Sequence, residues 1–388
     1  MKAIVVDAEW APRDGVDVPP EDAARRWAVN ANQVYRSPRF QIETVEDPSG
    51  PGPNELIVQV GSCGICGSDV HMYETDSDGY MLLPYHMRCP VVSGHEFAGV
   101  VVEVGSEVKD FASGDLVTVE EIQWCGTCLA CRGGYPNQCA HIEDLGFTIN
   151  GGFAEFVKVP EKACWKLNSL LDRYGTPEQA LEIGSMSEPA SVVYEGMFTR
   201  AGGFKPGGAV VVFGAGPIGL AACALAVAAG ASNVVCAETV ADRRALAEAC
   251  GADLSVDPTR ASVGEVVADL TAGRGAAMVV EASGNFKAVM GSIEDCLGVG
   301  GKVSVIGMDA RPATLNLIRH QLAAASVYGS VGHCGGWNFP NVIALMASGR
   351  IQMENAVTKR VALDGMVDAL AGTSDRRDGK ILVKPGQA

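Results

Sequence analysis

A glycine-rich turn between a hydrophobic strand and a helix constrains the fold of this chain more than any other feature. Val211-Val212-Phe213 run into Gly214-Ala215-Gly216-Pro217-Ile218-Gly219, and an apolar helical stretch follows. Strand, Gly-rich turn and helix in this order are the fingerprint of a dinucleotide-binding βαβ unit. Gly214 permits the tight turn, Gly216 lets the backbone approach a pyrophosphate, and Gly219 allows close packing of helix on strand. The expected cofactor-binding residues of this turn are Gly214, Gly216, Pro217, Ile218 and Gly219.

The residues around this turn alternate between strand and helix signals. Short runs rich in β-branched residues predict strands at 209–213, 233–237, 277–281 and 302–306, and Ala-rich stretches predict helices at 218–229, 241–249 and 262–271. Such alternation indicates βαβ units and a parallel sheet covered by helices on both faces. We therefore expect an α/β fold with a doubly wound Rossmann domain over residues 196–328.

The rest of the chain has a different residue pattern. At 388 residues the chain exceeds the length at which one hydrophobic core usually stops growing, so a second domain is expected. Runs at 56–61 and 97–104, bounded by Gly and Pro, predict short strands of an irregular β domain, and 381–384 predicts another strand. A polar segment near the start contains a helix-like stretch at 21–28.

The charge and the hydropathy pattern narrow the range of partners. Asp and Glu total 46 against 30 Lys and Arg, a formal net charge of −16, which repels nucleic acids and anionic bilayers. The first residues lack the features of a signal peptide, and the longest apolar stretch, around 221–229, is too short to span a membrane. We expect a cytoplasmic protein that binds a small molecule, with no nucleic-acid or membrane partner. Thirteen cysteines in such a chain favour metal ligation or buried thiols over disulfides.

Four of the cysteines form a tight cluster. Cys125, Cys128, Cys131 and Cys139 lie within fifteen residues of a loop rich in Gly, Pro and Asn. The spacing suits one closed tetrahedral zinc site, and the segment lacks the apolar periodicity that would bury four unrelated thiols. With no open position the metal is structural, and it fastens a lobe expected at 120–142.

A second group of possible metal ligands lies earlier in the chain. Cys66 belongs to a segment that reads Cys63-Gly-Ile-Cys-Gly-Ser-Asp-Val-His71, and His95 stands in Gly94-His95-Glu96. Cys66, His95 and a carboxylate can supply three ligands and leave the fourth position to water or substrate, as in a catalytic zinc site. Taken alone, each is more often an inert core residue, but the paired motifs favour the metal.

An acidic residue bears on the choice of dinucleotide. Glu238 ends the second predicted strand, 19 residues after Gly219, where a carboxylate accepts hydrogen bonds from the adenosine ribose and repels a 2′-phosphate. NAD is therefore favoured over NADP. Arg243 and Arg244 could instead pair with a phosphate, or form a solvated helix face. We take Glu238 as the stronger indicator and include Arg243 among the cofactor-binding residues.

These motifs together resemble one enzyme family over nearly the whole chain. Cys66-Gly-Ser-Asp-x-His71, Gly94-His-Glu-x2-Gly-x5-Gly105, the four-cysteine cluster and the Gly214 turn follow one another as in zinc-containing medium-chain dehydrogenases. The resemblance implies a GroES-like catalytic domain made from residues 1–195 and 329–388, with the Rossmann domain inserted and the active site in the cleft between them. It also implies two zinc ions per chain, and we expect a homo-oligomer, either a dimer or a tetramer.

The third protein ligand of the catalytic zinc separates the branches of that family. Liver-type alcohol dehydrogenases have a cysteine there, whereas Ser187-Glu188-Pro189 resembles the sorbitol and threonine dehydrogenase branch. The resemblance makes Glu188 a carboxylate near zinc, either directly or through water. Glu96 is the competing ligand, and the sequence leaves the choice open.

The resemblance also suggests a proton path. An alkoxide donates hydride far better than an alcohol does, so the site must stabilise negative charge on oxygen, which zinc does as a Lewis acid. By resemblance, Ser68 takes the hydroxyl proton and passes it through the nicotinamide ribose to His71, while Asp69 orients the metal ligands from behind. His71 could instead be a surface residue only.

For the substrate, several segments look most like inosose (cyclitol) dehydrogenases: the N-terminal elaboration, Cys66 to Met72, the Asp-Gly-Tyr that ends at Tyr80, Trp124-Cys125-Gly126, and the stretch from Phe339-Pro340 to Gly349. This implies oxidation of a secondary hydroxyl of a cyclitol, an inosose or an aminocyclitol to a ketone, with linear polyols and L-threonine as alternatives. Besides Glu96 and Glu188, four loop residues could satisfy substrate hydroxyls or could be surface or interface residues: Tyr73, His86, His333 and Trp337. A zinc-stabilised nucleic-acid binder is disfavoured by the charge, and a zinc-free reductase by the presence of both ligand sets.

Overall fold

The computed structural model describes residues 1–386 and divides into two compact units. The first unit contains residues 1–188, 359–375 and the chain from 381 onward, and the second contains 189–358 and 376–380. The first unit is therefore made from both ends of the chain, with the second unit inserted between them. No helix among the described residues is long and apolar enough to cross a membrane.

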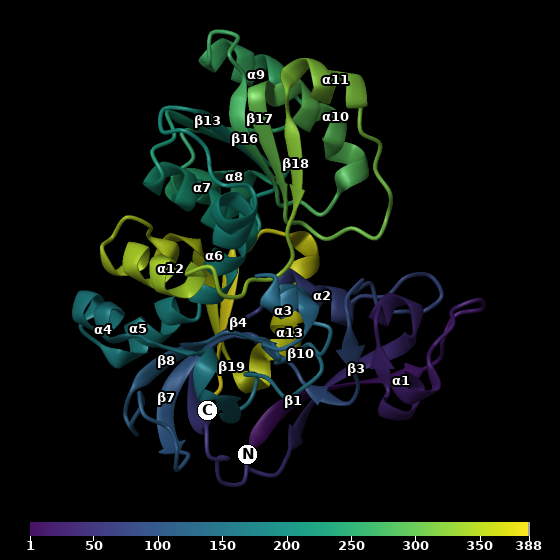
Figure 1. Ribbon diagram of the computed structural model, residues 1–388, viewed down its shortest axis with the longest axis vertical. Helices are drawn as coiled ribbons and strands as arrows, with labels where there is room; N and C mark the ends of the chain where they lie inside the picture. The colour runs from purple at the N-terminus through teal and green to yellow at the C-terminus, as the bar shows by residue number, and fades with distance from the viewer. Residues whose placement is uncertain (387–388) are drawn as a thin grey trace. The chain divides into compact units, whose positions relative to one another are not determined.

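The second unit is built on a six-stranded parallel sheet with the order β15-β14-β13-β16-β17-β18. Helices pack against the sheet, with α7 on β13 and β14 and α11 on β17 (Figure 1). Because helices cover the sheet, β13 is buried along its whole length and consists of apolar residues only. The strands are β13 (Ala209–Phe213), β14 (Asn233–Ala237), β15 (Leu254–Val256), β16 (Ala276–Glu281), β17 (Leu297–Val305) and β18 (Ser326–Gly329). The helices are α6 (Ser187–Tyr194), which begins at the unit boundary, η4 (Glu195–Arg200), α7 (Pro217–Ala228), α8 (Ala241–Ala249), α9 (Val263–Leu270), α10 (Phe286–Cys296), α11 (Leu317–Ala323), α12 (Asn338–Ala347) and η5 (Met353–Ala356).

The predicted alternation of strands and helices in this unit is confirmed. The strands predicted at 209–213 and 233–237 have the observed bounds, and the three predicted helices match α7, α8 and α9 to within one residue at each end. Strand β17 begins at Leu297, five residues before the predicted start, since Leu297 pairs with Ala276 ahead of an irregularity in the ladder. The three glycines in this stretch, at positions 298, 300 and 301, hid the strand signal.

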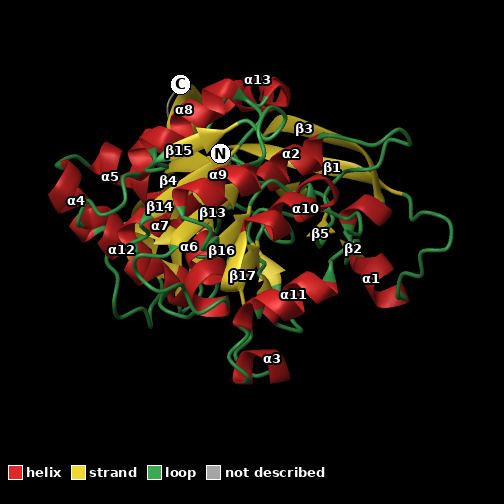
Figure 2. Cartoon of the chain, turned by 90° about the horizontal axis from the view of Figure 1, so that it is seen from above, coloured by secondary structure: helices red, strands yellow, loops and turns green. Residues whose placement is uncertain are grey.

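The first unit is mostly β. Its larger sheet has seven strands in the order β12-β8-β7-β4-β20-β19, with β11 also paired to β4, and a second sheet has the order β3-β1-β6. Phe97, Phe153 and Met72 are fully buried in its core. The strands are β1 (Lys2–Trp10), β2 (Trp27–Ala28), β3 (Tyr35–Thr44), β4 (Glu55–Gly64), β5 (Met87–Arg88), β6 (Val91–Val92), β7 (Glu96–Val104), β8 (Leu116–Val119), β9 (Ile122–Gln123), β10 (Glu143–Asp144), β11 (Phe156–Pro160), β12 (Cys164–Lys166), β19 (Val357–Ala362) and β20 (Lys380–Lys384). The helices are α1 (Pro20–Arg25), η1 (Ala31–Gln33), α2 (Gly67–Tyr73), α3 (Leu129–Arg132), η2 (Pro136–Gln138), η3 (Glu161–Ala163), α4 (Asn168–Tyr174), α5 (Pro177–Gly184), η6 (Leu363–Gly365), α13 (Met366–Ala371) and η7 (Gly372–Asp375). Figure 2 shows α3 as a short helix flanked by loop segments.

The helix predicted at 21–28 is wrong at its end. Helix α1 stops at Arg25, because Arg26 takes a left-handed conformation (φ 54°) that an α-helix cannot continue. Trp27 and Ala28 instead form β2, which pairs with β5. The segment therefore closes against the β domain and does not extend as a longer helix.

The compact units do not end where the sequence analysis placed the domain boundaries of 1–195, 196–328 and 329–388. The second unit starts at residue 189 and continues to 358. Side-chain contacts explain the extension: Asn338 Nδ2 donates to Glu195 Oε2 (2.7 Å), and Asn341 Nδ2 donates to Tyr194 Oη (2.9 Å). These bonds attach α12 to the helical segment around residue 195.

Candidate metal centres and dinucleotide site

Three potential metal ligands meet in the first unit. The ligand atoms of Cys66, His95 and Glu96 all lie within 4.8 Å of one another. His95 is 4% exposed and Glu96 is fully buried, while Cys66 is partly exposed. A sulfur, a nitrogen and an oxygen donor so arranged fit a tetrahedral zinc site with one open position.

The pairing of β4 with β7 brings these ligands together. Gly64 lies opposite Glu96 in the antiparallel ladder, so Cys66 follows the end of β4 while His95 immediately precedes β7. Gly94 makes the approach possible: its φ is +92°, and a Cβ there would lie 2.7 Å from the backbone nitrogen of Phe153. Only glycine fits at that position, which explains why a glycine precedes His95 and Glu96 in this motif.

Asp69 lies beside two of the ligands. Its Oδ2 accepts a hydrogen bond from the backbone N–H of Cys66 (2.8 Å), and its Oδ1 lies 4.0 Å from Nδ1 of His95. Asp69 is fully buried on α2. A carboxylate behind a ligating histidine orients the ring and raises its basicity, which is the role expected for Asp69.

The electrostatics of the centre favour a cation. Burial of His95 opposes the charged imidazolium, yet the negative charges of Cys66, Asp69 and Glu188 raise the pKa of His95 well above its usual range. Several anionic groups around one buried ring are the surroundings that a divalent cation neutralises. The donor set and the charge both fit zinc.

The two carboxylates that the sequence left in competition have different positions. Glu96 lies with Cys66 and His95, whereas a carboxylate oxygen of Glu188 lies within 4.8 Å of one of Glu121, and both side chains are buried. Glu188 is still near enough to act on the pKa of His95. Glu121 was not among the predicted site residues, although a pair of acidic residues directly after the buried strand β8 is a signal that could have identified it.

Ser68 and His71, the two proton-relay candidates, both lie on α2. Ser68 Oγ is 3.4 Å from Nε2 of His95, within hydrogen-bond distance. His71 is half-buried one turn further along the helix, where its carbonyl accepts a hydrogen bond from the backbone N–H of Leu82 (2.9 Å). The structure therefore places Ser68 at the ligand group and His71 on the same helix.

The four residues expected in loops that line a substrate pocket have varied surroundings, and Tyr73 is not in a loop but ends α2. In the first unit, the Tyr73 ring packs on Phe40. Nε2 of His86 lies within hydrogen-bond distance of Asp144 Oδ2, and the same oxygen accepts a hydrogen bond from the Tyr85 hydroxyl (2.9 Å). The Tyr85–Asp144 pair was missed, since its partners are 59 residues apart. In the second unit, the other two candidates differ sharply: His333 is fully buried and Trp337 is 75% exposed.

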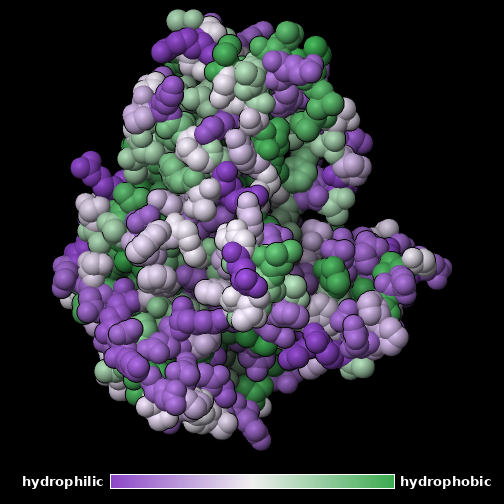
Figure 3. All heavy atoms as spheres, in the orientation of Figure 1, coloured by the Kyte–Doolittle hydropathy of each residue, from purple (hydrophilic) through white to green (hydrophobic). Residues whose placement is uncertain are grey.

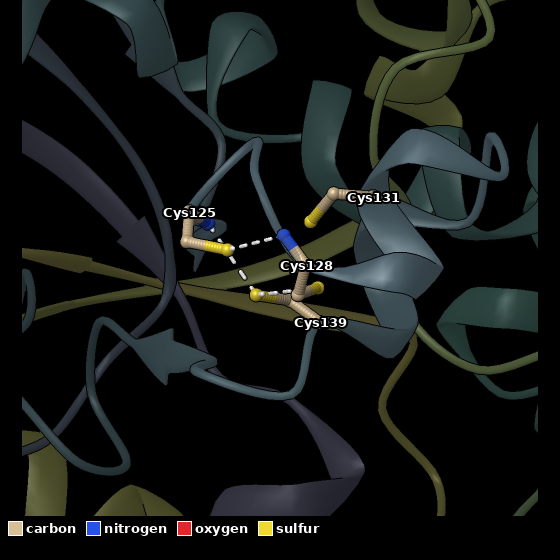
Figure 4. Close-up of side chains that lie close together, drawn as sticks. All are labelled: Cys125, Cys128, Cys131 and Cys139. Carbon is tan, nitrogen blue, oxygen red and sulfur yellow. Dashed lines mark hydrogen bonds between the residues drawn. The ribbon is translucent and has the colours of Figure 1, made fainter.

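The four-cysteine loop forms the second ligand group of the first unit. The sulfur atoms of Cys125, Cys128, Cys131 and Cys139 lie within 4.8 Å of one another (Figure 4). Backbone N–H groups donate to these sulfurs: that of Cys128 to Cys125 (3.3 Å), and those of Cys125 and His141 to Cys139 (3.4 and 3.3 Å). Four sulfur donors without an open position fit a structural zinc ion.

The local hydrogen bonds favour thiolates at this loop. The hydroxyl and backbone N–H of Thr127, with the N–H of Cys128, lower the pKa of Cys125 to about 5. Backbone N–H groups likewise lower the pKa of Cys128, whereas burial and the neighbouring thiols raise that of Cys131 to about 12. Hydrogen bonds that lower the pKa of a thiol favour its thiolate, which is the form that binds a metal ion.

In the second unit, the Gly-rich turn has the geometry of a dinucleotide site. Gly214 has φ +94°, and a Cβ on Gly219 would lie 1.8 Å from the Gly214 carbonyl oxygen, so α7 packs tightly on the turn. A Cβ on Gly216 would meet only Arg243 Nη1, at 4.0 Å, so the backbone there is open to a ligand. Pro217 and Ile218 form the first turn of α7. The open backbone at a helix N-terminus fits a pyrophosphate.

Charged residues beside the turn are held by the chain itself. Glu238 Oε2 accepts from the Ala215 N–H (2.8 Å) and its Oε1 from the Val240 N–H (2.9 Å). Arg244 donates to the carbonyl oxygen of Glu238 (2.8 Å), and Arg243 Nε donates to that of Asp378 (3.0 Å). The carboxylate therefore lies against the turn, while both guanidinium groups have partners in the protein.

Comparison with known proteins identifies the family. Residues 52–169 match the alcohol dehydrogenase GroES-like domain, and residues 217–348 match the zinc-binding dehydrogenase domain. The chain is 40% identical to scyllo-inosose 3-dehydrogenase of Thermotoga maritima, with 94% of each chain covered. It is 30% identical to L-threonine 3-dehydrogenase of Bacillus velezensis, with 86% of this chain and 92% of the relative covered.

A solved structure agrees with these matches. The structure of a putative alcohol dehydrogenase from Thermotoga maritima superposes with a TM-score of 0.95 at 38% identity, covering 99% of this chain and 100% of that one. The predicted fold class, a Rossmann sheet inserted in a GroES-like domain, is confirmed. The chain belongs to the zinc-binding alcohol dehydrogenase family, and it is an oxidoreductase that acts on a CH–OH group with zinc and a nicotinamide dinucleotide.

Proposed function

We propose that this enzyme oxidises a secondary hydroxyl of a cyclitol, an inosose or an aminocyclitol to a ketone, with NAD as the hydride acceptor. One observation carries the proposal: 40% identity over 94% of the chain to a scyllo-inosose 3-dehydrogenase. Residues of the first unit support it. Glu121 and Glu188 act electrostatically on the Tyr85 hydroxyl, and Glu188 also acts on His95 of the Cys66 group. Such polar groups can satisfy substrate hydroxyls that an apolar pocket would leave unpaired, at about 1–3 kcal/mol each.

The alternative substrates are L-threonine and linear polyols. The 30% identity to an L-threonine 3-dehydrogenase favours L-threonine as a substrate. The proposed carboxylates suit both L-threonine and a polyol. A ring bearing several hydroxyls makes more use of a wide polar surface than threonine does. We therefore rank the cyclitol class first.

In the proposed reaction Cys66, His95 and Glu96 hold the catalytic zinc, and Cys125, Cys128, Cys131 and Cys139 hold the structural zinc. Bound at the first group, zinc supplies Lewis-acid stabilisation of negative charge on the substrate oxygen. We infer that Ser68, whose Oγ lies 3.4 Å from Nε2 of His95, accepts the proton of the substrate hydroxyl while its own proton passes toward His71. Asp69 keeps the His95 ring in its ligating orientation.

The preference for NAD over NADP rests on Glu238. Its carboxylate lies at the turn, bonded to the N–H of Ala215, where it would repel a 2′-phosphate. Arg243 and Arg244 donate to backbone carbonyls, which makes them less available to a phosphate. We expect a higher kcat/KM with NAD than with NADP. The Glu238→Ala variant should show a smaller difference between the two cofactors. Equal use of both cofactors by the wild type would contradict the assignment.

We also propose a cytoplasmic homo-oligomer, a dimer or a tetramer. Figure 3 shows hydrophobic side chains gathered at the upper right, over α11, where Leu317, Ile318 and Leu322 are 71%, 56% and 80% exposed. Apolar side chains so exposed on one helix are typical of a protein interface. The four free cysteines proposed for the zinc lobe require a reducing compartment. Light scattering after size exclusion tests the oligomer, and Leu322→Glu should shift it toward the monomer.

A substrate panel tests the proposed activity. Zinc-replete enzyme is assayed for NADH formation with inositols, inososes, aminocyclitols, sorbitol, L-threonine and simple alcohols. We expect the highest kcat/KM with a ring polyol. Activity confined to L-threonine would move the enzyme to the alternative class, and a strong preference for ethanol would contradict the polar pocket.

A further inference from the structure

Two glutamates flank the Gly-rich turn, and the dinucleotide fingerprint accounts for only one of them. Phe213, the last residue of β13, pairs with Ala237 of β14 on one side and with Glu281 of β16 on the other. Glu238 follows Ala237 and bonds to the turn directly. Glu281 ends β16, so it stands at the carboxyl edge of the sheet, where ligands of doubly wound folds bind.

Glu281 is a fully buried acid that organises the loop following it. Its Oε1 accepts hydrogen bonds from the backbone N–H groups of Ser283 (2.9 Å) and Gly284 (3.0 Å), and from the Ser283 hydroxyl. Its main-chain oxygen accepts from the N–H groups of Ile306 and Gly307. One side chain therefore folds the loop 282–285 back onto the end of its own strand.

This loop is the surface on which the Gly-rich turn rests. The N–H of Ala282 donates to the carbonyl oxygen of Phe213 (2.9 Å), and a Cβ on Gly214 would lie 2.8 Å from Ser283 Cα. No side chain at position 214 would fit between the turn and the loop. A shift of Ser283 must therefore move or release Gly214.

An apolar residue at position 281 would have cost less to bury. Burial raises the pKa of the Glu281 carboxyl, and a Cβ on Gly307 would lie 2.4 Å from its Oε2, so the group is tightly enclosed. Removing the side chain would leave these partly buried donors of the loop without their acceptor. Among residues 1–386, Oε2 has no hydrogen-bond partner, so the loop needs one acceptor oxygen and not a charge.

We propose that Glu281 is a positioning residue for the dinucleotide, which fixes the loop 282–285 as the support of the Gly214 turn. The turn is thus held from both neighbouring strands, by Glu238 through a direct bond to Ala215 and by Glu281 through the loop. The inference rests on the proposed assignment of this turn as the dinucleotide site.

The test compares dinucleotide binding with stability in three variants. NADH affinity is measured by fluorescence titration of the zinc-replete protein, together with Tm and the KM for NAD. Glu281→Ala should raise the Kd for NADH and the KM for NAD about 10-fold while kcat changes less than about 2-fold. Glu281→Gln keeps an acceptor oxygen of the same reach and should stay within about 2-fold of the wild type.

Glu294→Ala is the matched control. Glu294 is also a buried acid of the second unit, and its Oε1 accepts from the N–H of Asn316 (2.7 Å), away from the turn. This variant should lower Tm and leave the Kd for NADH unchanged. Wild-type affinity in Glu281→Ala, or an equal loss in Glu294→Ala, would overturn the proposal.

Two further measurements keep the outcome decisive. If Glu281→Ala does not fold, Ser283→Ala removes a single donor from the same carboxyl and should raise the Kd about 2-fold to 3-fold, and an unchanged Kd would overturn the proposal. Wild-type protein is titrated first. Absence of NADH binding there would refute the proposed dinucleotide use itself, a result distinct from a loss limited to the 281 and 283 variants.

Discussion

The two ligand groups of the first unit are built in opposite ways. The four cysteines come from one loop of fifteen residues, and backbone N–H groups of that loop donate to their sulfurs. Cys66 follows one strand and His95 precedes another, so the two strands must first pair, and Asp69 lies beside both residues. The loop holds its ligands by local geometry, whereas the buried group depends on the sheet. A local site can serve stability alone, while a site assembled by the fold can leave a position open for chemistry.

The largest expected effect separates the two groups by activity. His95→Ala or Cys66→Ala removes the proposed support for charge on the substrate oxygen, worth several kcal/mol, so kcat should fall about 10³-fold. Zinc content should drop from two ions to one per chain, with NADH affinity retained. Near wild-type kcat in either variant would end the assignment of a catalytic metal to this group.

The second prediction concerns the four-cysteine loop. Cys128→Ser removes one of four ligands from a lobe with little core of its own, and the loss of a structural metal should cost at least about 3 kcal/mol in the free energy of unfolding. The measurement is thermal or denaturant unfolding beside an activity assay at low temperature. Activity per folded molecule should persist. A variant of full stability but without activity would reverse the roles of the two groups.

Asp69→Asn probes how far the buried group depends on its surroundings. The amide keeps an acceptor for the N–H of Cys66 but loses the negative charge 4.0 Å from the His95 ring. Zinc affinity or kcat should fall about 10-fold to 100-fold. Competition with a chelator, followed by metal analysis, gives the affinity. Zinc in the four-cysteine loop should not change, and a loss from both groups would show that they are coupled.

The smallest effect is a control for general stability. Glu182 is buried on α5 and accepts from Lys384 Nζ and Arg360 Nε, both at 2.9 Å. Burial alone would raise the pKa of Glu182, but these two cations lower it below the ordinary 4.5. The stabilisation is therefore present above pH 4.5 and disappears as the pH falls through the lower folded value.

Glu182→Gln should reduce the free energy of unfolding by about 1–2 kcal/mol at pH 7. The difference from the wild type should shrink below pH 4.5, which urea unfolding at several pH values measures. Neither zinc ion should be lost. A difference that grows toward low pH would mean that the carboxylate destabilises the fold.

The same contrast between local and assembled structure explains what could be predicted from the sequence. The motif from Val211 to Gly219 is local in sequence, and so is the spacing of the four cysteines. The turn and the ligand cluster could therefore be predicted from the sequence alone. The end of the first predicted helix was missed because Arg26 adopts a positive φ and Trp27 pairs with a distant strand. Neither cause is visible in helix propensity.

The residues missed at the sites share one property. Glu121 becomes a candidate site residue because it lies near Glu188, and Glu281 because it pairs with Phe213 next to the turn. In both cases the partner is far away in sequence. The choice between Glu96 and Glu188 stayed open for the same reason. Only the register of β4 against β7 places Glu96 with Cys66. Pairings of this kind depend on the whole sheet and are not encoded in any short segment.

That register has a practical consequence for anyone who purifies the protein. A slip of one residue between β4 and β7 would turn the side chains of one strand to the opposite face and separate the two halves of the buried ligand group. The four-cysteine loop would keep its sulfurs together in such a chain. We expect mispaired chains to bind one zinc ion instead of two, so the zinc content per chain checks the pairing of the sheet as well as the cofactor loading.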